Sequence, residues 1–531
     1  MYDVKMISSC PRGYKVKKEN NMNQNKFLNA MKDNTNFTRT ENGALTHKTT
    51  RSDLLDMFAM GAAYRSRSDE DVILMFRKAF AENPAYAMKC LFYIRDVRGG
   101  QGERRFFRVC MRDLATQNLD AAKRNLHNIP EYGRWDDLLV FIGTPLEKDA
   151  MAVIKTQLVL DVQCKTPSLL AKWLPSENTS SAKTRAQAAV VRKYLGWTHK
   201  QYRKTLSVLR ARINVLERLM SENRWDEIEF DKIPSRAGMI YKNAFARHDL
   251  ERVQSEKAVQ SYADFAKDTT KKVNAKALYP YECVAEAMKV MGCNQHSWYS
   301  SYGKRVPMDD TNRLMVNKYW DNLADYFNGA AFNGLAMVDT SSSMTWNGGL
   351  AIQVATSLGI YCAEKAKGPF AGHYISFSRN PRLVAVEGVD FCDKVDRIVR
   401  ADLCENTNIK GAFDMLLNTA VTHRMAQDDI PKNIIVISDM EFDSATRYSG
   451  VVNETLFESI AREWATYGYQ MPHLIFWNVN ARQNNIPMLG NGPISYVSGF
   501  SPSIFETIMT GKTGYDLMMD KLNSERYAAV K

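Results

Sequence analysis

The spacing of apolar residues changes near residue 330, and this change divides the chain into two kinds of structure. Beyond that point, short apolar runs alternate with segments of helical spacing. The apolar runs lie near 335–339, 373–378, 382–387, 433–439, 473–480 and 494–500, and the helical patterns near 349–366, 390–401, 409–424, 453–467 and 502–510. This alternation predicts an α/β domain with a largely parallel, doubly wound sheet.

Upstream of residue 330, apolar residues recur at helical spacing instead. The segments are 52–64, 69–80, 84–94, 103–117, 149–162 and 201–220. In the last of these, Leu206, Leu209, Ile213, Leu216 and Leu219 predict the buried face of one helix. Paired helices over such a length favour a solenoid of HEAT-like units, whose period is about 40 residues, although no strict repeat is legible.

Three regions are therefore expected. Residues 1–45 are rich in Asn and Lys and have few large apolar side chains, which predicts a flexible tail. A helical-repeat domain follows over 46–330, and an α/β domain over 331–531.

An acidic residue and two hydroxyls end the first strand of the predicted sheet. The apolar run stops at Asp339, and Ser341 and Ser343 follow before the next helix. Alternate residues of an extended segment point the same way, so these three oxygen donors are expected to converge. Mg²⁺ prefers such hard oxygen ligands.

Two further oxygen donors come from later loops. Thr407 precedes the helical pattern at 409, and Asp439 ends the strand near 433–439. In doubly wound sheets, ligands bind at the carboxyl ends of strands. We therefore predict a site for Mg²⁺ or another divalent cation, formed by Asp339, Ser341, Ser343, Thr407 and Asp439. The alternative is a serine-rich cap on an ordinary strand-to-helix turn.

Charge is distributed unevenly along the chain. Residues 1–330 hold 54 Lys and Arg against 38 Asp and Glu, a net of +16, whereas residues 331–531 hold 17 against 21, a net of −4. Residues 151–212 contain 12 basic residues and only two acidic ones, Asp161 and Glu177. A polyanion is the natural partner of such a segment.

Aromatic residues adjoin several of these basic residues, as at Trp173, Tyr194, Trp197 and Tyr202. Basic groups that hold phosphates beside rings that stack on unpaired bases suit single-stranded or small noncoding RNA. The alternative is a solvated basic face with the rings in the core. The predicted RNA-binding residues are Lys172, Lys183, Arg185, Arg192, Lys193, Lys200, Arg203, Lys204, Arg210 and Arg212.

A second candidate RNA surface is the glycine-rich segment 94–105. Its glycines could expose backbone amides to a phosphate in the turn before a helix. The basic residues nearby are Arg95, Arg98, Arg104 and Arg105. An ordinary inter-helix turn with solvated arginines explains the segment equally well.

Other classes of protein find little support. No H-E-x-x-H or G-x-S-x-G motif occurs, and Gly511-Lys512-Thr513 lacks the earlier glycine of a phosphate-binding loop. A nuclease using Asp439, Glu441 and Asp443 is a minor alternative to a non-catalytic protein. No secretion signal or apolar membrane span is visible, and the nine cysteines are scattered without a C-x-x-C pair. We therefore expect a reduced cytoplasmic protein with no membrane attachment.

The chain from Gly43 to Gly511 resembles a TROVE-type helical module followed by a von Willebrand factor A domain, as in Ro-type ribonucleoproteins. It is more similar still to an uncharacterised plant, bacterial and viral family of that architecture. The resemblance rests on residues 42–45, 94–105, 132–139, 170–176 and 437–443.

This resemblance implies a metal-ion-dependent adhesion site. The two serines and the threonine would bind metal directly, the aspartates largely through water, and a partner's carboxylate would fill the open position. It also implies a closed helical ring that binds misfolded and small noncoding RNAs. Our first hypothesis is a non-catalytic RNA-binding scaffold whose metal site recruits an acidic protein. The alternative is a protein-interaction module that docks carboxylates on the metal without RNA.

Overall fold

The computed structural model describes residues 36–255, 257, 259–293, 306–377, 379–401, 407–443, 454–488 and 492–531. Most of the predicted tail, residues 1–35, therefore lies outside the described residues. Its predicted end at residue 45 is wrong, because β1 (Phe37–Arg39) and β2 (Leu45–His47) are strands, and Thr40 and Ala44 are buried.

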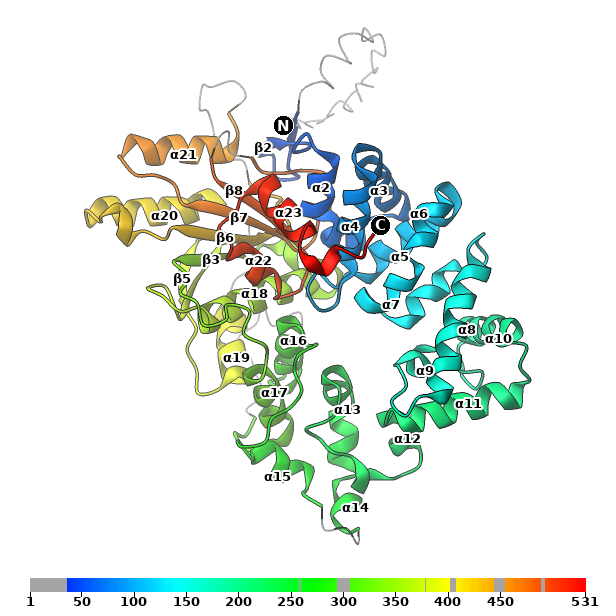
Figure 1. Ribbon diagram of the computed structural model, residues 1–531. Coiled ribbons are helices and arrows are strands. Elements are labelled where there is room, and N and C mark those ends of the chain that lie inside the picture. Colours follow the sequence, from blue (N-terminus) through cyan, green and yellow to red (C-terminus); the bar gives the residue numbers. More distant parts are fainter. Residues whose placement is uncertain are drawn as a thin grey trace, which may run out of the picture. The chain divides into compact units, whose positions relative to one another are not determined.

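The C-terminal part contains a mixed sheet of six strands (Figure 1). Five strands are parallel, and only the edge strand β5 runs antiparallel to its neighbour. The prediction of an α/β domain with a largely parallel sheet is confirmed. The strand order is β5-β4-β3-β6-β7-β8, and the strands are β3 (Gly334–Asp339), β4 (His373–Phe377), β5 (Arg382–Ala385), β6 (Asn433–Ser438), β7 (His473–Asn478) and β8 (Ile494–Ser498).

Helices cover both faces of this sheet. In β3, Leu335 and Met337 belong to one core, and the alternate residues Ala336 and Val338 belong to the other. The first core includes α20 (Ile409–Thr422), α21 (Leu456–Thr466) and part of α23 (Gly514–Leu522); the second includes α18 (Trp346–Lys365), α19 (Phe391–Ala401) and α22 (Ile504–Ile508). Such double coverage explains why the central strands are apolar throughout.

The N-terminal part is helical, as predicted. Polar caps begin many helices, for example Ser52, Ser68 and Asn83, each of which accepts a backbone N–H of the first turn. The helices are α2 (Asp53–Met60), α3 (Asp69–Glu82), α4 (Pro84–Arg95), α5 (Arg104–Gln117), α6 (Leu119–Arg124), α7 (Ile129–Tyr132), α8 (Glu147–Gln163), α9 (Leu170–Trp173), α10 (Ala182–Leu195), α11 (His199–Arg212), α12 (Leu216–Ser221), α13 (Ser235–Arg247), α14 (Asp249–Val253), α15 (Tyr262–Lys267), α16 (Pro280–Val290) and α17 (Thr311–Asp321).

The prediction of one helix over 201–220 is wrong. Helix α11 ends at Arg212, and α12 begins at Leu216. Asn214 between them has a φ of 48°, a left-handed conformation that an α-helix does not accommodate.

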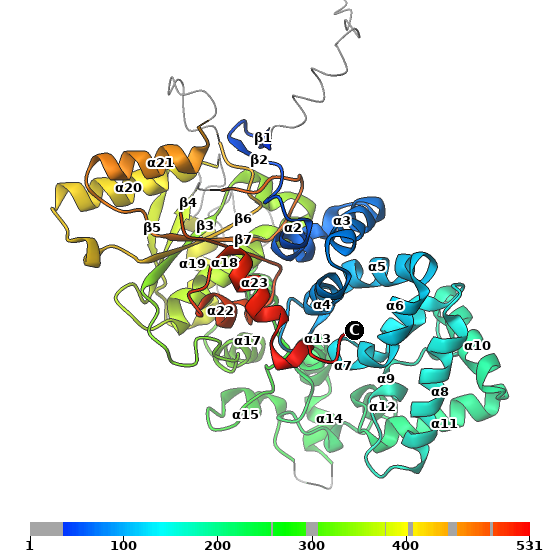
Figure 2. The same cartoon turned by 45° about the horizontal axis from the view of Figure 1, so that its top comes forward.

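Both ends of the helical part pack against the α/β part. Helix α2 contacts β8 and α4 contacts α23, whereas α16 contacts α18 and α19 (Figures 1 and 2). Buried residues of α2–α11 join the first sheet core, and those of α12–α17 join the second. The boundary predicted near residue 330 therefore does not separate two independent cores.

Candidate functional site

Four of the five predicted metal-ligating side chains form one hydrogen-bonded chain. Asp339 Oδ1 accepts the amide of Ser341 at 2.9 Å, and the Oγ atoms of Ser341 and Ser343 are 3.1 Å apart. Ser343 Oγ donates to Asp439 Oδ2 at 3.1 Å. The residues come from the carboxyl ends of β3 and β6, which are neighbours in the sheet. The chain order reverses there, since β4 follows β3 on its other side, so the cluster lies at the topological switch point.

Thr407, the fifth residue, is joined to the cluster indirectly. Asn42 Nδ2 donates to Thr407 Oγ1 at 3.2 Å and to the carbonyl of Glu441 at 2.6 Å. The Asp443 amide donates to the Thr407 carbonyl at 3.1 Å. Thr407 is buried and lies beside the loop that follows β6. We name Asp339, Ser341, Ser343, Thr407 and Asp439 the oxygen cluster.

Burial and mutual repulsion act on the two aspartates of the oxygen cluster. Burial, followed by the charge of Asp439, raises the pKa of Asp339 to about 7. Burial also raises the pKa of Asp439, although Arg482 opposes this shift. Ser438 Oγ donates to Asp339 Oδ2 at 2.5 Å. A bound cation, in addition to the positive charge of Arg482, would reduce the repulsion between the carboxylates of Asp339 and Asp439.

Arg482 supplies one positive charge at this place. Its Nη2 lies 3.0 Å from Asp439 Oδ2, and the same guanidinium also pairs with Glu41. The guanidinium carbon is 4.9 Å from the ring centroid of Trp346, whose side chain is exposed. The sequence did not single out Arg482, because no local pattern marks it. Ser438, which precedes Asp439 directly, was also missed.

The spacings among Ser341, Ser343 and Asp439 are compatible with a small, hard cation. In octahedral Mg²⁺ complexes, ligands lie at about 2.1 Å, so adjacent ligand oxygens are about 3 Å apart. The spacings from Ser341 to Ser343 and from Ser343 to Asp439, both 3.1 Å, match this requirement. Within the described part of the chain, no group of three or more His, Cys, Asp and Glu side chains is placed to hold a metal. The oxygen cluster differs from such groups because three of its five members are hydroxyls.

The predicted basic surface lies on α10 and α11, beside α8 (Figure 2). Six of its side chains are exposed and, among the described residues, have no acid within ion-pair distance. These are Lys183, Arg185, Lys193, Lys200, Arg203 and Lys204, which we name the basic face. The aromatic neighbours differ in exposure, since Tyr202 is fully buried and Tyr194 is exposed.

The other predicted RNA-binding residues of this region contact the rest of the protein, and within the basic face Arg185 also donates to the carbonyls of Thr179 and Ser180, at 2.6 and 2.8 Å. Arg192 pairs with Glu177 at 2.8 Å. Arg210 donates to the carbonyls of Ala171 and Leu174, both at 2.9 Å. The exposed Arg212 donates to a carbonyl of α8, and Lys172 is half-buried near Trp173. Only part of the predicted set is therefore free to bind phosphate.

Arg95 is not part of an RNA surface. Its side chain is 2% exposed, and Nη2 lies 2.7 Å from Asp137, which is fully buried. Asp137 also pairs with Arg108. Arg98, Arg104 and Arg105 lie at the surface of the same segment, where Arg98 pairs with Glu131 and Arg105 with Asp69.

Three amides of the glycine-rich turn are used inside the protein and are not offered to a phosphate. The amides of Gln101, Gly102 and Glu103 donate to the carbonyls of Tyr93, Asp96 and Ile94 respectively. The turn instead joins the two parts of the chain. Ser503 Oγ donates to the carbonyl of Gly100, and Arg526 and Tyr527 bind Asp96.

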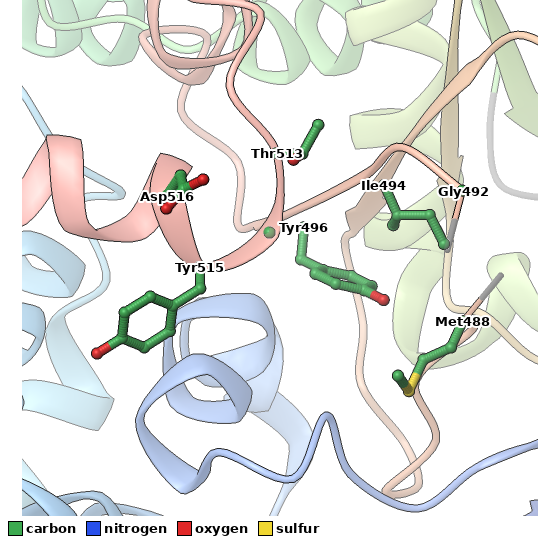
Figure 3. Close-up of a pocket in the computed structure, with 8 residues that line it drawn as sticks. Met488, Gly492, Ile494, Tyr496, Thr513, Tyr515 and Asp516 are labelled. Carbon is green, nitrogen blue, oxygen red and sulfur yellow. The ribbon is translucent and has the colours of Figure 1, made fainter. Parts of the chain in front are cut away.

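A separate hollow of about 260 Å³ lies beside the first turn of α23 (Figure 3). It is lined by Met488, Gly492, Ile494, Tyr496, Thr513, Gly514, Tyr515 and Asp516. Among the described residues that line it, none belongs to the oxygen cluster and Asp516 is the single charged one. Across the described residues, no helix combines the length and apolar character needed to cross a membrane.

Comparison with known proteins gives a family. The family model described as "Domain of unknown function (DUF7788)" matches residues 333–528, which include the oxygen cluster. The model "Domain of unknown function (DUF2828)" matches residues 40–169 and 168–329. "Uncharacterized protein L728" of Acanthamoeba polyphaga mimivirus is 30% identical over 519 residues, covering 90% of this chain and 85% of the viral protein. The chain therefore belongs to the DUF2828 family.

Proposed function

We propose that this protein is a non-catalytic cytoplasmic scaffold with two binding activities. The basic face binds RNA, in the manner of the Ro-type proteins that the chain resembles. The oxygen cluster binds Mg²⁺, and through it an acidic side chain of a protein partner, as in von Willebrand factor A domains. The free state of all seven described cysteines agrees with a reducing compartment.

The metal-binding activity rests on one observation. Oxygen donors from two adjacent strand ends meet at the switch point with the spacing of Mg²⁺ ligands. Asp339, Ser341 and Ser343 would hold the cation together with Thr407 and Asp439. When bound, the cation would act as a Lewis acid that accepts a partner's carboxylate.

The RNA-binding activity rests on the contrast between two groups of basic residues. The arginines of the glycine-rich segment mostly face acids, whereas the basic face forms no ion pair with any residue that the structure describes. Unpaired cations on one surface are the electrostatic footprint of a phosphate backbone.

Substitution of Asp339 by alanine tests the metal-binding activity. At a Mg²⁺ concentration about 100 times Kd, a single site stabilises the native state by about 2.7 kcal/mol. We expect Asp339→Ala to lose this stabilisation, because the variant lacks a carboxylate of the cluster. The measurement is the Mg²⁺ dependence of thermal unfolding.

Asp414→Ala is the matched control. Asp414 lies on α20 of the same domain and pairs with Lys410 at 2.7 Å, away from the cluster. It should respond to Mg²⁺ as the wild type does. An unchanged metal response in Asp339→Ala would remove the assignment of the site.

Substitution of Lys200, Arg203 and Lys204 by glutamine tests the RNA-binding activity. Each lost phosphate contact lowers the slope of log K against log salt by about 0.7 for single strands, so the slope should fall by about 2. RNA affinity should decrease while the melting temperature stays the same, because all three side chains are exposed. The measurement is a salt titration of binding to a labelled single-stranded RNA.

The charge-matched control replaces Lys271, Lys272 and Lys276, which are exposed in a loop outside the basic face. It should bind RNA like the wild type. If the variant of Lys200, Arg203 and Lys204 kept its RNA affinity, the RNA surface would have to lie elsewhere. The next candidates would be Arg98, Arg104 and Arg105.

One observation favours a protein-interaction module without RNA. Val208 on α11 and Leu169 are each more than half exposed near the basic face. Exposed apolar side chains of this kind suit a protein partner better than RNA. Purified complexes that survive nuclease treatment would support this second function.

A further inference from the structure

The turn of residues 40–44 lies against the loop that follows β6. Its own backbone closes through the Gly43 amide, which donates to the Thr40 carbonyl at 3.0 Å. Thr40 Oγ1 donates to the carbonyl of Phe442 at 2.6 Å, and Gly43 forms an isolated bridge with Asp443. We name residues 40–44 the strap.

The strap also reaches the oxygen cluster. Asn42 donates to the hydroxyl of Thr407, which is a member of the cluster. The Glu41 amide donates to the carboxylate of Glu441 at 2.6 Å, two residues after Asp439. The strap therefore binds the loops that supply the last two oxygen donors.

A carboxylate of the strap shares a cation with the cluster. Arg482 pairs with Glu41 through Nη1 and with Asp439 through Nη2. The Arg482 side chain is 11% exposed, whereas that of Glu41 is 35% exposed. Glu41 is thus an acidic side chain next to the cluster, on the side that remains open to solvent.

Four members of the cluster are almost completely buried, whereas Ser343 is half-buried. Asp339, Ser341, Thr407 and Asp439 are each at most 1% exposed. An acidic partner cannot reach donors with so little exposure. For such a partner to bind, a neighbouring segment must first move.

We infer that the strap is an internal occupant of the metal site, with Glu41 in the role of the partner's carboxylate. Arg482 is the latch, because it holds Glu41 and Asp439 together. A partner must displace the strap, and the chemistry that fits is a Glu or Asp side chain that replaces Glu41 beside Arg482 and reaches the cation. This inference rests on the proposed metal-binding function.

The contacts that hold the strap against the oxygen cluster are weak enough for a partner to displace it. Its contacts with the cluster are few, and its one ion pair is partly exposed, so that pair contributes about 1 kcal/mol or less. A binding site that is open only part of the time has an affinity reduced by the open fraction. Weakening the strap should therefore raise affinity for an acidic ligand.

The test uses the full chain with Glu41→Gln and with the double variant Glu41→Gln, Asn42→Ala. The probe is a fluorescently labelled oligoglutamate peptide in saturating Mg²⁺. We expect the double variant to bind the peptide about tenfold tighter than the wild type, and Glu41→Gln about threefold tighter. Amide hydrogen exchange at residues 40–44 should accelerate in both variants.

Glu222→Gln is the control, since Glu222 is 42% exposed, close to the 35% of Glu41, and forms ion pairs with Arg218 and Arg224. It should match the wild type in both measurements. The inference is overturned if the double variant binds the peptide no more tightly than the wild type, or if exchange at residues 40–44 is unchanged. If the wild type binds no Mg²⁺, that result would instead overturn the proposed function.

Discussion

Arginine side chains in this protein serve two different purposes, and burial separates them. Arg95 is enclosed with Asp137, whereas Arg203 is exposed and forms no ion pair within the described part of the chain. A buried ion pair is costly to break, because the remaining partner is left as an uncompensated charge. An exposed cation can be replaced with little effect on stability.

Replacement of Arg95 by methionine should therefore destabilise the fold. Asp137 would keep Arg108 and the amide of Arg134 as partners, so we expect a loss near the lower end of the usual range, about 3 kcal/mol. Urea unfolding measures this loss. Arg98→Met should lose about 1 kcal/mol or less, since Arg98 and Glu131 are 58% and 62% exposed. Equal stability of Arg95→Met and the wild type would contradict the interior role of Arg95.

The sequence predicted the site residues that lie close together along the chain and missed those that meet only after folding. Asp339, Ser341 and Ser343 lie within five residues, and strand ends marked Asp439. Asn42 contacts Thr407 across 365 positions, and Arg482 contacts Asp439 across 43. No spacing rule encodes such pairs, so the strap and its latch became visible only in the folded chain.

Elements were predictable where apolar periodicity is strong. The six strands and the helices between them follow the pattern closely, because alternating or continuous apolar runs specify which faces are buried. The break at Asn214 escaped notice, since the apolar spacing continues through it. For the glycine-rich turn the sequence left two interpretations open, a phosphate site and an ordinary inter-helix turn, because glycines suit close packing as well as an open backbone.

Gly100 shows this packing role. A Cβ atom there would lie 2.1 Å from the carbonyl oxygen of Tyr93, which is backbone and cannot move aside cheaply. We expect Gly100→Ala to cost about 3 kcal/mol, at the upper end of overpacking effects. Denaturant midpoints measure the change.

Gly196→Ala provides the comparison. Its φ is 71°, but nothing lies within 4 Å of the added Cβ atom, so it should cost only about 1 kcal/mol. Equal losses at the two glycines would contradict the packing account of the turn.

The helical and α/β parts of residues 38–531 share their hydrophobic cores. Helices from the first half of the helical part adjoin one sheet core, and those from the second half adjoin the other. The alternation near residue 335 predicted the layers of the sheet, but no sequence pattern states which helices cover which face. The arrangement links the basic face and the oxygen cluster within one structural unit.

Mapping of bound RNA on the full chain tests the proposed scaffold most directly. The protein is crosslinked by ultraviolet light to the RNA that co-purifies with it, and crosslinked peptides are identified by mass spectrometry. The account predicts crosslinks within residues 170–212, around α10 and α11, and none within residues 334–528. Absence of bound RNA, or crosslinks concentrated in the α/β part, would contradict it.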